Sequence, residues 1–275
     1  MIESKVSIIG LGYVGLPLVL AIASSCKHSV YGFDIDPGKI MEAKKNGIEA
    51  STDVKIIKDS EYVIICVPTP VKSSKKPDMT HIISASGNVA KYLEKNQKII
   101  IESTINPGVC EEIIIPILEK SGLKAGGDFI LAHCPERINP GDPEWNVTNI
   151  PRNVGAVTID GCRVVADFYR GFIDAPITEM SCLKAAEATK VIENTFRDIN
   201  IAYVNELAKS FDCLQIDLVE VIDAAKNKPF SFVKEKFLYS QKKTFCKHKG
   251  CEATLVRHLS LGKISEKKSC IQKRN

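Results

Sequence analysis

The strongest constraint on the fold is a glycine-rich turn between a short apolar run and a segment of helical periodicity. Residues 5–10 form the apolar run, and apolar side chains recur with helical spacing through residues 13–25. The turn between them reads Gly10-Leu-Gly12-Tyr-Val-Gly15. A G-x-G-x-x-G sequence that follows a strand and opens a helix is the pattern of a dinucleotide-binding turn. The sequence therefore predicts a nucleotide-binding βαβ unit here.

Each position of the turn has a separate physical task. Gly10 permits the tight turn, Gly12 lets the backbone approach a pyrophosphate, and Gly15 allows close packing of helix on strand. The start of the helix offers unpaired N–H groups and a partial positive charge to phosphate oxygens. Tyr13 and Val14 complete the turn, and we count them with the three glycines as cofactor-binding residues.

Asp34 indicates which dinucleotide binds. A second strand-like run over residues 29–34 ends at Asp34, 19 residues beyond Gly15. An acidic residue at this distance bonds the adenosine ribose hydroxyls. Its negative charge also repels a 2′-phosphate, so the sequence predicts NAD rather than NADP as the cofactor.

Strand-like and helical segments continue to alternate up to about residue 180. Further strand-like runs lie at residues 62–67, 98–102, 129–133 and 153–159, with a short run at 176–178. Helical segments lie at residues 37–46, 80–94, 108–121 and 161–173. Strands that alternate with helices form a parallel sheet. We therefore expect an α/β fold with a Rossmann-like, doubly wound parallel sheet, followed by a long-helix central domain.

Residues 181–211 contain no Gly or Pro and read as one long helix, with a second helix at about 216–226. The long helix has an apolar stripe with helical spacing, formed by Ile192, Phe196, Ile199, Tyr203 and Leu207. Such a stripe packs either on a second copy of the chain or on the chain's own sheet domain. The spacing alone leaves both possibilities open.

Charge divides the chain into unequal regions. Residues 233–275 carry 12 Lys and Arg against 3 Asp and Glu, whereas the rest of the chain carries 25 against 30. We therefore expect an NAD-binding domain at 1–180, a helical dimerisation or substrate domain at 181–232, and an atypical basic tail at 233–275 without a convincing core. The tail has few aromatic residues and no groove-reading motif, so we expect no nucleic-acid partner.

Composition also bears on the compartment. No run of 18 apolar residues occurs, so we expect no membrane-spanning segment. The N-terminal residues lack the features of a signal peptide, and the ten cysteines are scattered, mostly within apolar segments, as small buried hydrophobes are. We expect a cytoplasmic protein.

Three short polar motifs follow predicted strands: Cys66-Val-Pro-Thr69-Pro, Glu102-Ser-Thr104 and Cys134-Pro-Glu136-Arg137. Ligands of open α/β sheets bind outside the carboxyl ends of the strands. A single Thr after a strand is ordinary turn chemistry. Three polar motifs at one edge of a sheet predict the lining of a ligand site.

Taken together, these motifs resemble the UDP-sugar 6-dehydrogenases, which use NAD to oxidise the C6 alcohol of a nucleotide sugar, through an aldehyde, to a uronic acid. The resemblance covers roughly residues 5–232. Its most specific pieces are Ile8-Ile-Gly-Leu-Gly-Tyr-Val-Gly-Leu-Pro17, Val67-Pro-Thr-Pro70, Glu102-Ser-Thr104, Cys134-Pro-Glu-Arg-Ile-Asn-Pro-Gly141 and Glu187-Ala-Thr-Lys-Val-Ile-Glu-Asn-Thr195. It implies NAD as cofactor, a UDP-sugar as substrate and a homodimer formed through the long central helix.

The resemblance also implies roles for single residues. Thr69, Thr104 and Glu136 line the nicotinamide and substrate side, and Lys190 and Asn194 support the oxyanion at C6. A spacing of four places Lys190 and Asn194 on one face of a helix, and an ammonium with an amide is a typical oxyanion stabiliser. We expect Thr104, Glu136, Lys190 and Asn194 to be catalytic, and Thr69 and Thr104 to contact the cofactor.

The loop after Glu136 bears on the identity of the sugar. UDP-glucose dehydrogenases usually carry a second Glu four residues further on, where this chain has Pro140. The chain resembles instead the branch that acts on UDP-N-acetylhexosamines, either UDP-N-acetylmannosamine or UDP-N-acetylglucosamine. The expected function is oxidation of such a sugar for polysaccharide biosynthesis.

Family members carry a Gly-Gly-His-Cys motif shortly after the stretch that here reads Asn227-Lys-Pro-Phe230, and its Cys is the nucleophile of the second oxidation. Residues 233–275 lack this motif, so we expect a truncated chain in which an unrelated tail replaces the nucleophile and the C-terminal domain. The tail residues that could serve as a nucleophile or as zinc ligands are Cys246, Cys251, His258 and Cys270. None of them lies in a matching motif, so we expect no metal.

Two alternatives stay open. The chain could be a truncated, non-catalytic relative that keeps NAD binding and dimerisation. It could also be a two-domain Rossmann dehydrogenase of the hydroxyacid or 6-phosphogluconate type, although the Glu187–Thr195 and Cys134–Gly141 motifs argue against that class.

Overall fold

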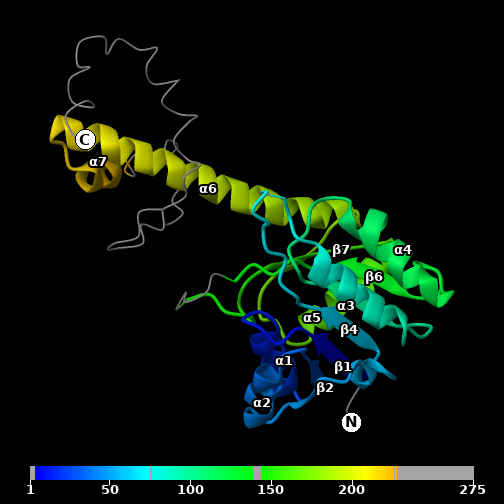
Figure 1. The fold of residues 1–275 in the computed structure, drawn as a ribbon. Coiled ribbons are helices and arrows are strands. Elements are labelled where there is room, and N and C mark those ends of the chain that lie inside the picture. Colours follow the sequence, from blue (N-terminus) through cyan, green and yellow to red (C-terminus); the bar gives the residue numbers. More distant parts are fainter. Residues whose placement is uncertain (1–3, 75, 139–143, 226, 228–275) are drawn as a thin grey trace. The chain divides into compact units, whose positions relative to one another are not determined.

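A computed structural model describes residues 4–74, 76–138, 144–225 and 227 of the chain (Figure 1). Pro140 and the tail at 233–275, on which several expectations fall, lie outside these residues. The chain divides into two compact units, residues 1–193 and 194–275, and each is described by itself. No helix among the described residues has the length and apolar character needed to cross a membrane.

The first unit is built on one eight-stranded sheet in the order β3-β2-β1-β4-β5-β6-β7-β8. The strands are β1 (Ser4–Ile9), β2 (His28–Phe33), β3 (Glu49–Ser51), β4 (Tyr62–Ile65), β5 (Lys98–Ile101), β6 (Ile130–His133), β7 (Arg152–Ala156) and β8 (Ile177–Glu179). The first six strands in this order run parallel. From β1 the chain adds β2 and β3 toward one edge of the sheet, and from β4 it adds β5 and β6 toward the other edge. This strand order is that of a doubly wound nucleotide-binding sheet.

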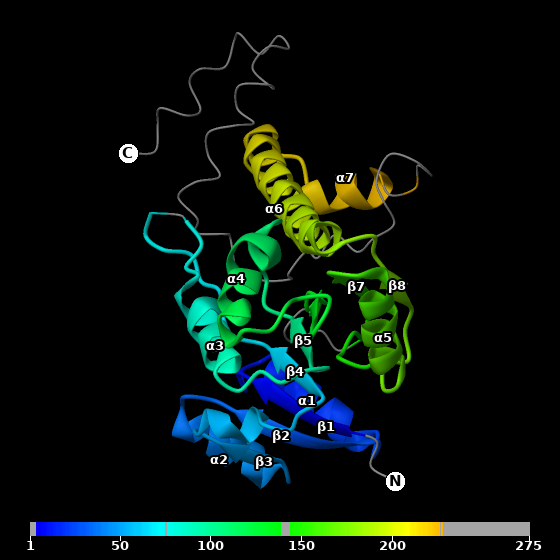
Figure 2. The ribbon, with the colours of Figure 1, turned by 90° about the vertical axis from the view of Figure 1, so that its right-hand side faces the viewer.

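Helices cover both faces of the sheet (Figure 2). One face carries α1 (Gly15–Ser24), α2 (Pro37–Lys45) and α5 (Ile159–Arg170). The other carries α3 (Thr80–Ala90), η2 (Cys110–Ile114) and α4 (Ile115–Leu118). Short turns η1 (Val54–Ile57) and η3 (Glu119–Ser121) complete this unit.

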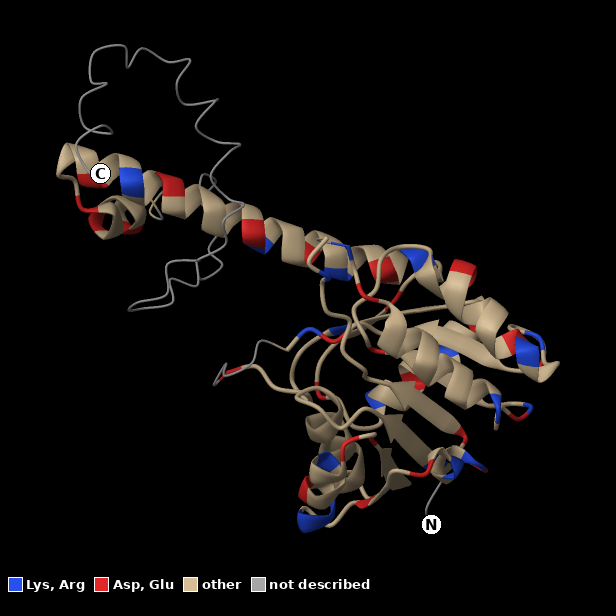
Figure 3. Ribbon diagram, viewed as in Figure 1, with Lys and Arg blue, Asp and Glu red and all other residues tan. Residues whose placement is uncertain are grey.

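Alternation along the strands explains why both faces are apolar. In β4, Tyr62 and Ile64 belong to the core under α1, α2 and α5, whereas Val63 and Ile65 belong to the core under α3 and α4. Successive side chains of a strand point to opposite faces, so a run without polar residues becomes a strand buried on both sides. Figure 3 shows the result, because Lys, Arg, Asp and Glu lie mainly on helices and connecting segments.

Two expectations about this unit were wrong in detail. The sheet is not wholly parallel, since β7 runs antiparallel to β6. The described residues between these two strands, 134–138 and 144–151, form no crossover helix, which a parallel return would need. The helix expected at 108–121 is three pieces, because Pro116 lacks an N–H and disturbs the preceding turn, which becomes the π-helical η2. The short β3 and η1 had no distinct signal in the sequence.

The two helices expected after residue 180 are confirmed as α6 (Leu183–Leu214) and α7 (Leu218–Ala225). On the part of α6 in the second unit, Phe196 is 54% exposed and Ile199 is 58% exposed. Of the seven cysteines among the described residues, all are free and four are buried: Cys66, Cys110, Cys134 and Cys162.

His133 ends β6 and gives the stability a pH dependence that can be measured. Burial lowers the pKa of His133 to about 3, against a smaller opposing effect of the Ile101 backbone. An unfolded chain takes up a proton below about pH 6.5 that the folded chain refuses. The free energy of unfolding should therefore fall by about 2 kcal/mol between pH 7 and pH 5 on account of this group.

Urea unfolding at pH 7, 6 and 5 checks this expectation. His133→Leu should lose that part of the pH dependence, while a substitution of the exposed His81 to Gln should keep the wild-type slope. Equal slopes for His133→Leu and the wild type would show that His133 is not the responsible group.

Candidate functional site

The glycine turn joins β1 to α1 and has the shape of a ligand cradle. Gly10 has φ +93° and donates its N–H to the carbonyl of Phe33 at 2.8 Å. A Cβ at Gly10 would lie 2.8 Å from the carbonyl oxygen of Cys66, and one at Gly15 would overlap the carbonyl oxygen of Gly10. A Cβ at Gly12 would meet nothing within 4 Å. The first and third glycines are therefore needed by the fold, whereas Gly12 faces open space.

Asp34 anchors the same turn. Its carboxylate accepts hydrogen bonds from the backbone N–H groups of Leu11 at 2.7 Å and Asp36 at 2.9 Å. No side chain caps the N-terminus of α1 at Val14, so the positive end of the helix dipole faces the turn, although the N–H of Leu16 already donates to the carbonyl oxygen of Gly12 at 3.0 Å. Both features fit a dinucleotide whose pyrophosphate lies on α1 and whose ribose lies near Asp34.

The motifs after β4 and β5 meet at the carboxyl edge of the sheet. The Thr69 hydroxyl donates to the carbonyl oxygen of Thr104 at 2.6 Å. Ser103 in turn donates to the carbonyl oxygen of Val67 at 2.7 Å. These bonds hold the segments of Thr69 and Thr104 together at one edge of the sheet, whereas their role in a ligand site stays a prediction.

Glu136 brings the third motif to this edge. Its N–H donates to the carbonyl oxygen of Glu102 at 3.3 Å, and its side chain is buried. Partial desolvation and the negative charge of Glu136 both raise the pKa of Tyr13, which belongs to the glycine turn. The carboxylate therefore lies near the cofactor cradle.

Lys190 is supplied by α6 and is buried in the first unit. The helix starts against β7, where a Cβ on Gly155 would overlap the carbonyl oxygen of Cys182. Asn194 belongs to the second unit, so the structure does not relate it to Thr104 or Glu136.

The sequence does not predict the buried ionic network that lies beneath this edge. Arg152 Nη1 lies 3.0 Å from Glu102 Oε2, and the Tyr169 hydroxyl donates to Glu102 Oε1 at 2.6 Å. All three side chains are fully buried or nearly so. An arginine that opens a buried strand is the only sequence signal, and it does not identify a partner 50 residues away.

The two buried cysteines at this edge are held as thiols. Burial raises the pKa of Cys134 to about 12, and burial followed by the charge of Glu102 raises the pKa of Cys66 well above its usual value. A thiol is a far weaker nucleophile than a thiolate. We therefore assign neither cysteine a covalent step.

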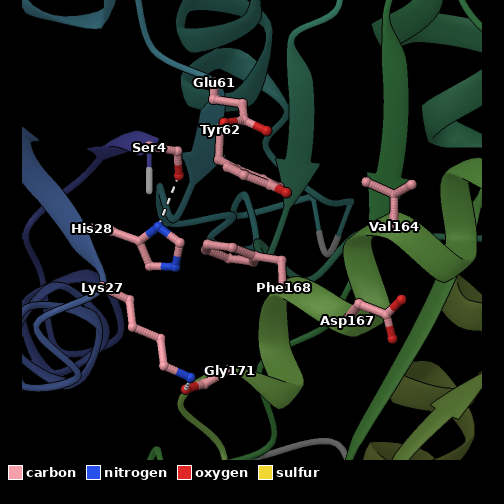
Figure 4. A pocket seen from close by; sticks show the side chains of 9 residues that line it. All are labelled: Ser4, Lys27, His28, Glu61, Tyr62, Val164, Asp167, Phe168 and Gly171. Atoms are coloured by element: carbon pink, nitrogen blue, oxygen red, sulfur yellow. Dashed lines mark hydrogen bonds between the residues drawn. The ribbon is translucent and has the colours of Figure 1, made fainter. Parts of the chain in front are cut away.

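A hollow of about 500 Å³ lies at the opposite edge of the sheet (Figure 4). Ser4, His28 and Tyr62 line it from β1, β2 and β4, and Phe168 lines it from α5. Phe168 stacks on Tyr62 with ring centroids 4.1 Å apart and lies beside the tilted ring of His28 at 5.4 Å. Parallel sheets bind ligands at the other edge, and no motif residue lies here.

The cradle and the sheet define the class of protein: a Rossmann protein with a dinucleotide-binding turn. The chain matches the NAD binding domain of the UDP-glucose/GDP-mannose dehydrogenase family over residues 4–50 and 42–173. It matches the central domain of the same family over residues 184–242. The chain belongs to this family, which confirms the expected resemblance, fold class and cofactor.

Several individual proteins are similar to this chain over most of its length. Protein CapL of Staphylococcus aureus is 41% identical over 240 residues, which cover 82% of this chain and 56% of that protein. A UDP-N-acetyl-D-glucosamine 6-dehydrogenase of Pseudomonas aeruginosa is 41% identical over 246 residues, covering 83% and 58%. The solved structure of a UDP-D-ManNAc dehydrogenase from Pyrococcus horikoshii matches with a TM-score of 0.76 at 32% identity, covering 82% and 58%. The chain therefore spans a little over half the length of these relatives.

Proposed function

We propose that the chain carries out NAD-dependent oxidation of the C6 alcohol of a UDP-N-acetylhexosamine, toward the uronic acid used in polysaccharide biosynthesis. The main support is the meeting of Thr69, Thr104 and Glu136 beside the glycine cradle. The names of the relatives favour UDP-N-acetylglucosamine or UDP-N-acetylmannosamine over UDP-glucose.

The residues of the chain would divide the work as follows. NAD, when bound at Gly10, Gly12, Gly15 and Asp34, supplies the hydride acceptor. Lys190 would donate a hydrogen bond from Nζ to the C6 oxygen, and Asn194 would donate one from its amide. Both would stabilise the negative charge that develops on this oxygen as its hydroxyl proton passes to a water molecule and the C6 hydride passes to NAD.

Thr104 and Glu136 would orient the sugar in this scheme, and Thr69 and Thr104 with Tyr13 and Val14 would border the cofactor. The buried Glu136 carboxylate can accept a hydrogen bond from a sugar hydroxyl, and fixing the sugar in this way lowers the entropy lost at the transition state. These roles belong to the proposal.

We also propose that residues 181–232 serve as a central dimerisation and substrate domain in a cytoplasmic homodimer. The exposed Phe196 and Ile199 on α6 support an apolar interface with a second copy. The free cysteines among the described residues suit a reducing compartment.

A non-catalytic relative that binds NAD and dimerises is the second candidate. One observation favours it: the cysteines beside the candidate site, Cys66 and Cys134, are buried thiols and do not suit the second oxidation.

Purified chain with NAD and each UDP-sugar separates the two candidates. We expect NAD to bind, and NADH to form with a UDP-N-acetylhexosamine but much more slowly with UDP-glucose. Lys190→Met should slow NADH formation about 100- to 1,000-fold, as loss of an oxyanion donor does, without changing the affinity for NAD. Lys209→Met, which removes an exposed lysine of the same helix, is the matched control. NAD binding without NADH from any UDP-sugar would support the non-catalytic relative.

A further inference from the structure

Lys190 lies between two carboxylates of the same helix. Glu187, Lys190 and Glu193 follow one another at a spacing of three along α6, so they lie on successive turns of one broad face. All three belong to the first unit. Each carboxylate is bound to a different segment that follows a strand of the sheet, and these segments carry the other candidate site residues.

Glu187 ties the helix to the segment after β5. Its fully buried carboxylate accepts hydrogen bonds from the backbone N–H groups of Gly108 at 2.5 Å and Cys110 at 2.8 Å. These N–H groups lie at the start of η2, where a negative charge is favoured. The same segment contains Thr104, so Glu187 fixes the start of α6 relative to that residue.

Glu193 ties the helix to the segment after β6. Arg137 contacts both oxygens of Glu193, from Nη2 at 2.6 Å and from Nε at 3.3 Å. Its remaining nitrogen, Nη1, donates to the carbonyl oxygen of Pro151 at 3.0 Å, immediately before β7. Arg137 follows Glu136 directly in the chain, so this pair joins α6, the Glu136 loop and the entry to β7.

A helix held at one point can still tilt or turn about that point. A shift of one residue along α6 moves a side chain by about 1.5 Å and rotates it by about 100°. Misplacement of about 1 Å is enough to slow a reaction roughly 100-fold. The second attachment, on the other side of Lys190 and to a different segment, removes this freedom.

We propose that Arg137 and Glu193 are a positioning pair, which together with Glu187 sets the place of Lys190 relative to Thr104 and Glu136. The proposal rests on the proposed function, in which Lys190 contacts the C6 oxygen. Arg137 and Glu193 are 27% and 29% exposed at their side chains. Exposed pairs contribute little to stability, but a two-pronged guanidinium–carboxylate contact fixes geometry. The pair therefore acts on alignment more than on folding.

A double-mutant cycle tests the pair in the full chain. Arg137→Gln and Glu193→Gln should each lower kcat for NADH formation about tenfold, with the KM for the sugar and the affinity for NAD nearly unchanged. The double variant should be no slower than either single variant, because coupled residues are not additive. Arg137→Lys should not restore the rate, because an ammonium lacks the planar fork. Arg163→Gln, at an exposed ion pair on α5, is the control and should leave all values unchanged.

A second measurement does not depend on turnover. The buried Lys190 should react slowly with an amine-selective acylating reagent, followed by mass spectrometry, and several-fold faster in Arg137→Gln and Glu193→Gln. The exposed Lys209 reports any general loosening and should react equally in all variants. Faster labelling of Lys190 without NADH from the wild type would uphold the pair and overturn the proposed function. Unchanged labelling, or rates that multiply in the double variant, would overturn the pair.

Discussion

Gly12→Ala should weaken NAD binding strongly and leave the fold intact, whereas Gly15→Ala should destabilise the fold itself. A methyl group at Gly12 meets no protein atom within 4 Å, so it intrudes only on the space that a pyrophosphate would use. A methyl group at Gly15 overlaps the carbonyl oxygen of Gly10, and neither backbone can move without separating α1 from β1. Two glycines of the same turn are thus expected to affect different properties, NAD binding for Gly12 and stability of the fold for Gly15.

The sizes of these effects follow from steric overlap. Forcing a methyl group into occupied space costs about 1–3 kcal/mol, which is a roughly 10- to 100-fold weaker affinity for NAD in Gly12→Ala. In Gly15→Ala the same overlap falls on rigid backbone, so the free energy of unfolding should drop by about 3 kcal/mol or more.

Isothermal titration with NAD and urea unfolding of both variants check the two effects. Gly87→Ala is the control, because that glycine lies within α3 and a Cβ there meets nothing within 4 Å. It should leave NAD affinity unchanged and leave stability equal or slightly higher. Normal NAD affinity in Gly12→Ala would mean that the dinucleotide does not lie on this turn.

The sequence predicts those parts of the site that depend on neighbours along the chain. The turn from Gly10 to Gly15 and the position of Asp34 require one strand, one turn and one helix, and each leaves a local pattern. The structure adds that Asp34 also binds the N–H of Leu11, which no spacing rule contains. Thr69 and Thr104 were placed together because the carboxyl ends of parallel strands share one edge of the sheet.

Contacts between distant residues were not predictable in the same way. Arg137 and Glu193 are 56 positions apart, and Arg152 and Glu102 are 50 apart. The reversed direction of β7 depends on what the chain does between β6 and β7, where no periodic pattern exists. The apolar pattern fixes which faces are buried, but it does not identify which charged side chains are paired inside.

Arg152→Met should destabilise the protein by about 3–5 kcal/mol, because it leaves the charge of Glu102 buried without a partner. Glu102 and Arg152 are both fully shielded from solvent. Burial acting alone would lower the pKa of Arg152, but the negative charge of Glu102 overcomes this and the pKa is raised. Each of these two buried charges is therefore compensated only while the other is present.

Replacing the whole network should recover most of this loss. In the triple variant Glu102→Met, Arg152→Met, Tyr169→Phe, no charge and no hydroxyl remains buried without a partner, and such replacements of a buried ion pair are often neutral or stabilising. Tyr169→Phe alone should have a moderate effect of about 1.5–3 kcal/mol, since it removes one hydrogen bond to a charged group.

Urea unfolding of the three variants measures these differences, and NAD titration of the triple variant measures their consequence for the site. Arg163→Met is the control: its ion pair with Asp160 is exposed, so the free energy of unfolding should change by less than about 1 kcal/mol. The Glu102 backbone also accepts the N–H of Glu136, so the network lies directly beneath the residue proposed to orient the sugar. If Arg152→Met were as stable as the wild type, Glu102 would have to be neutral in the folded protein. Its hydrogen bond with Tyr169, rather than the ion pair, would then hold the carboxyl end of β5 in place.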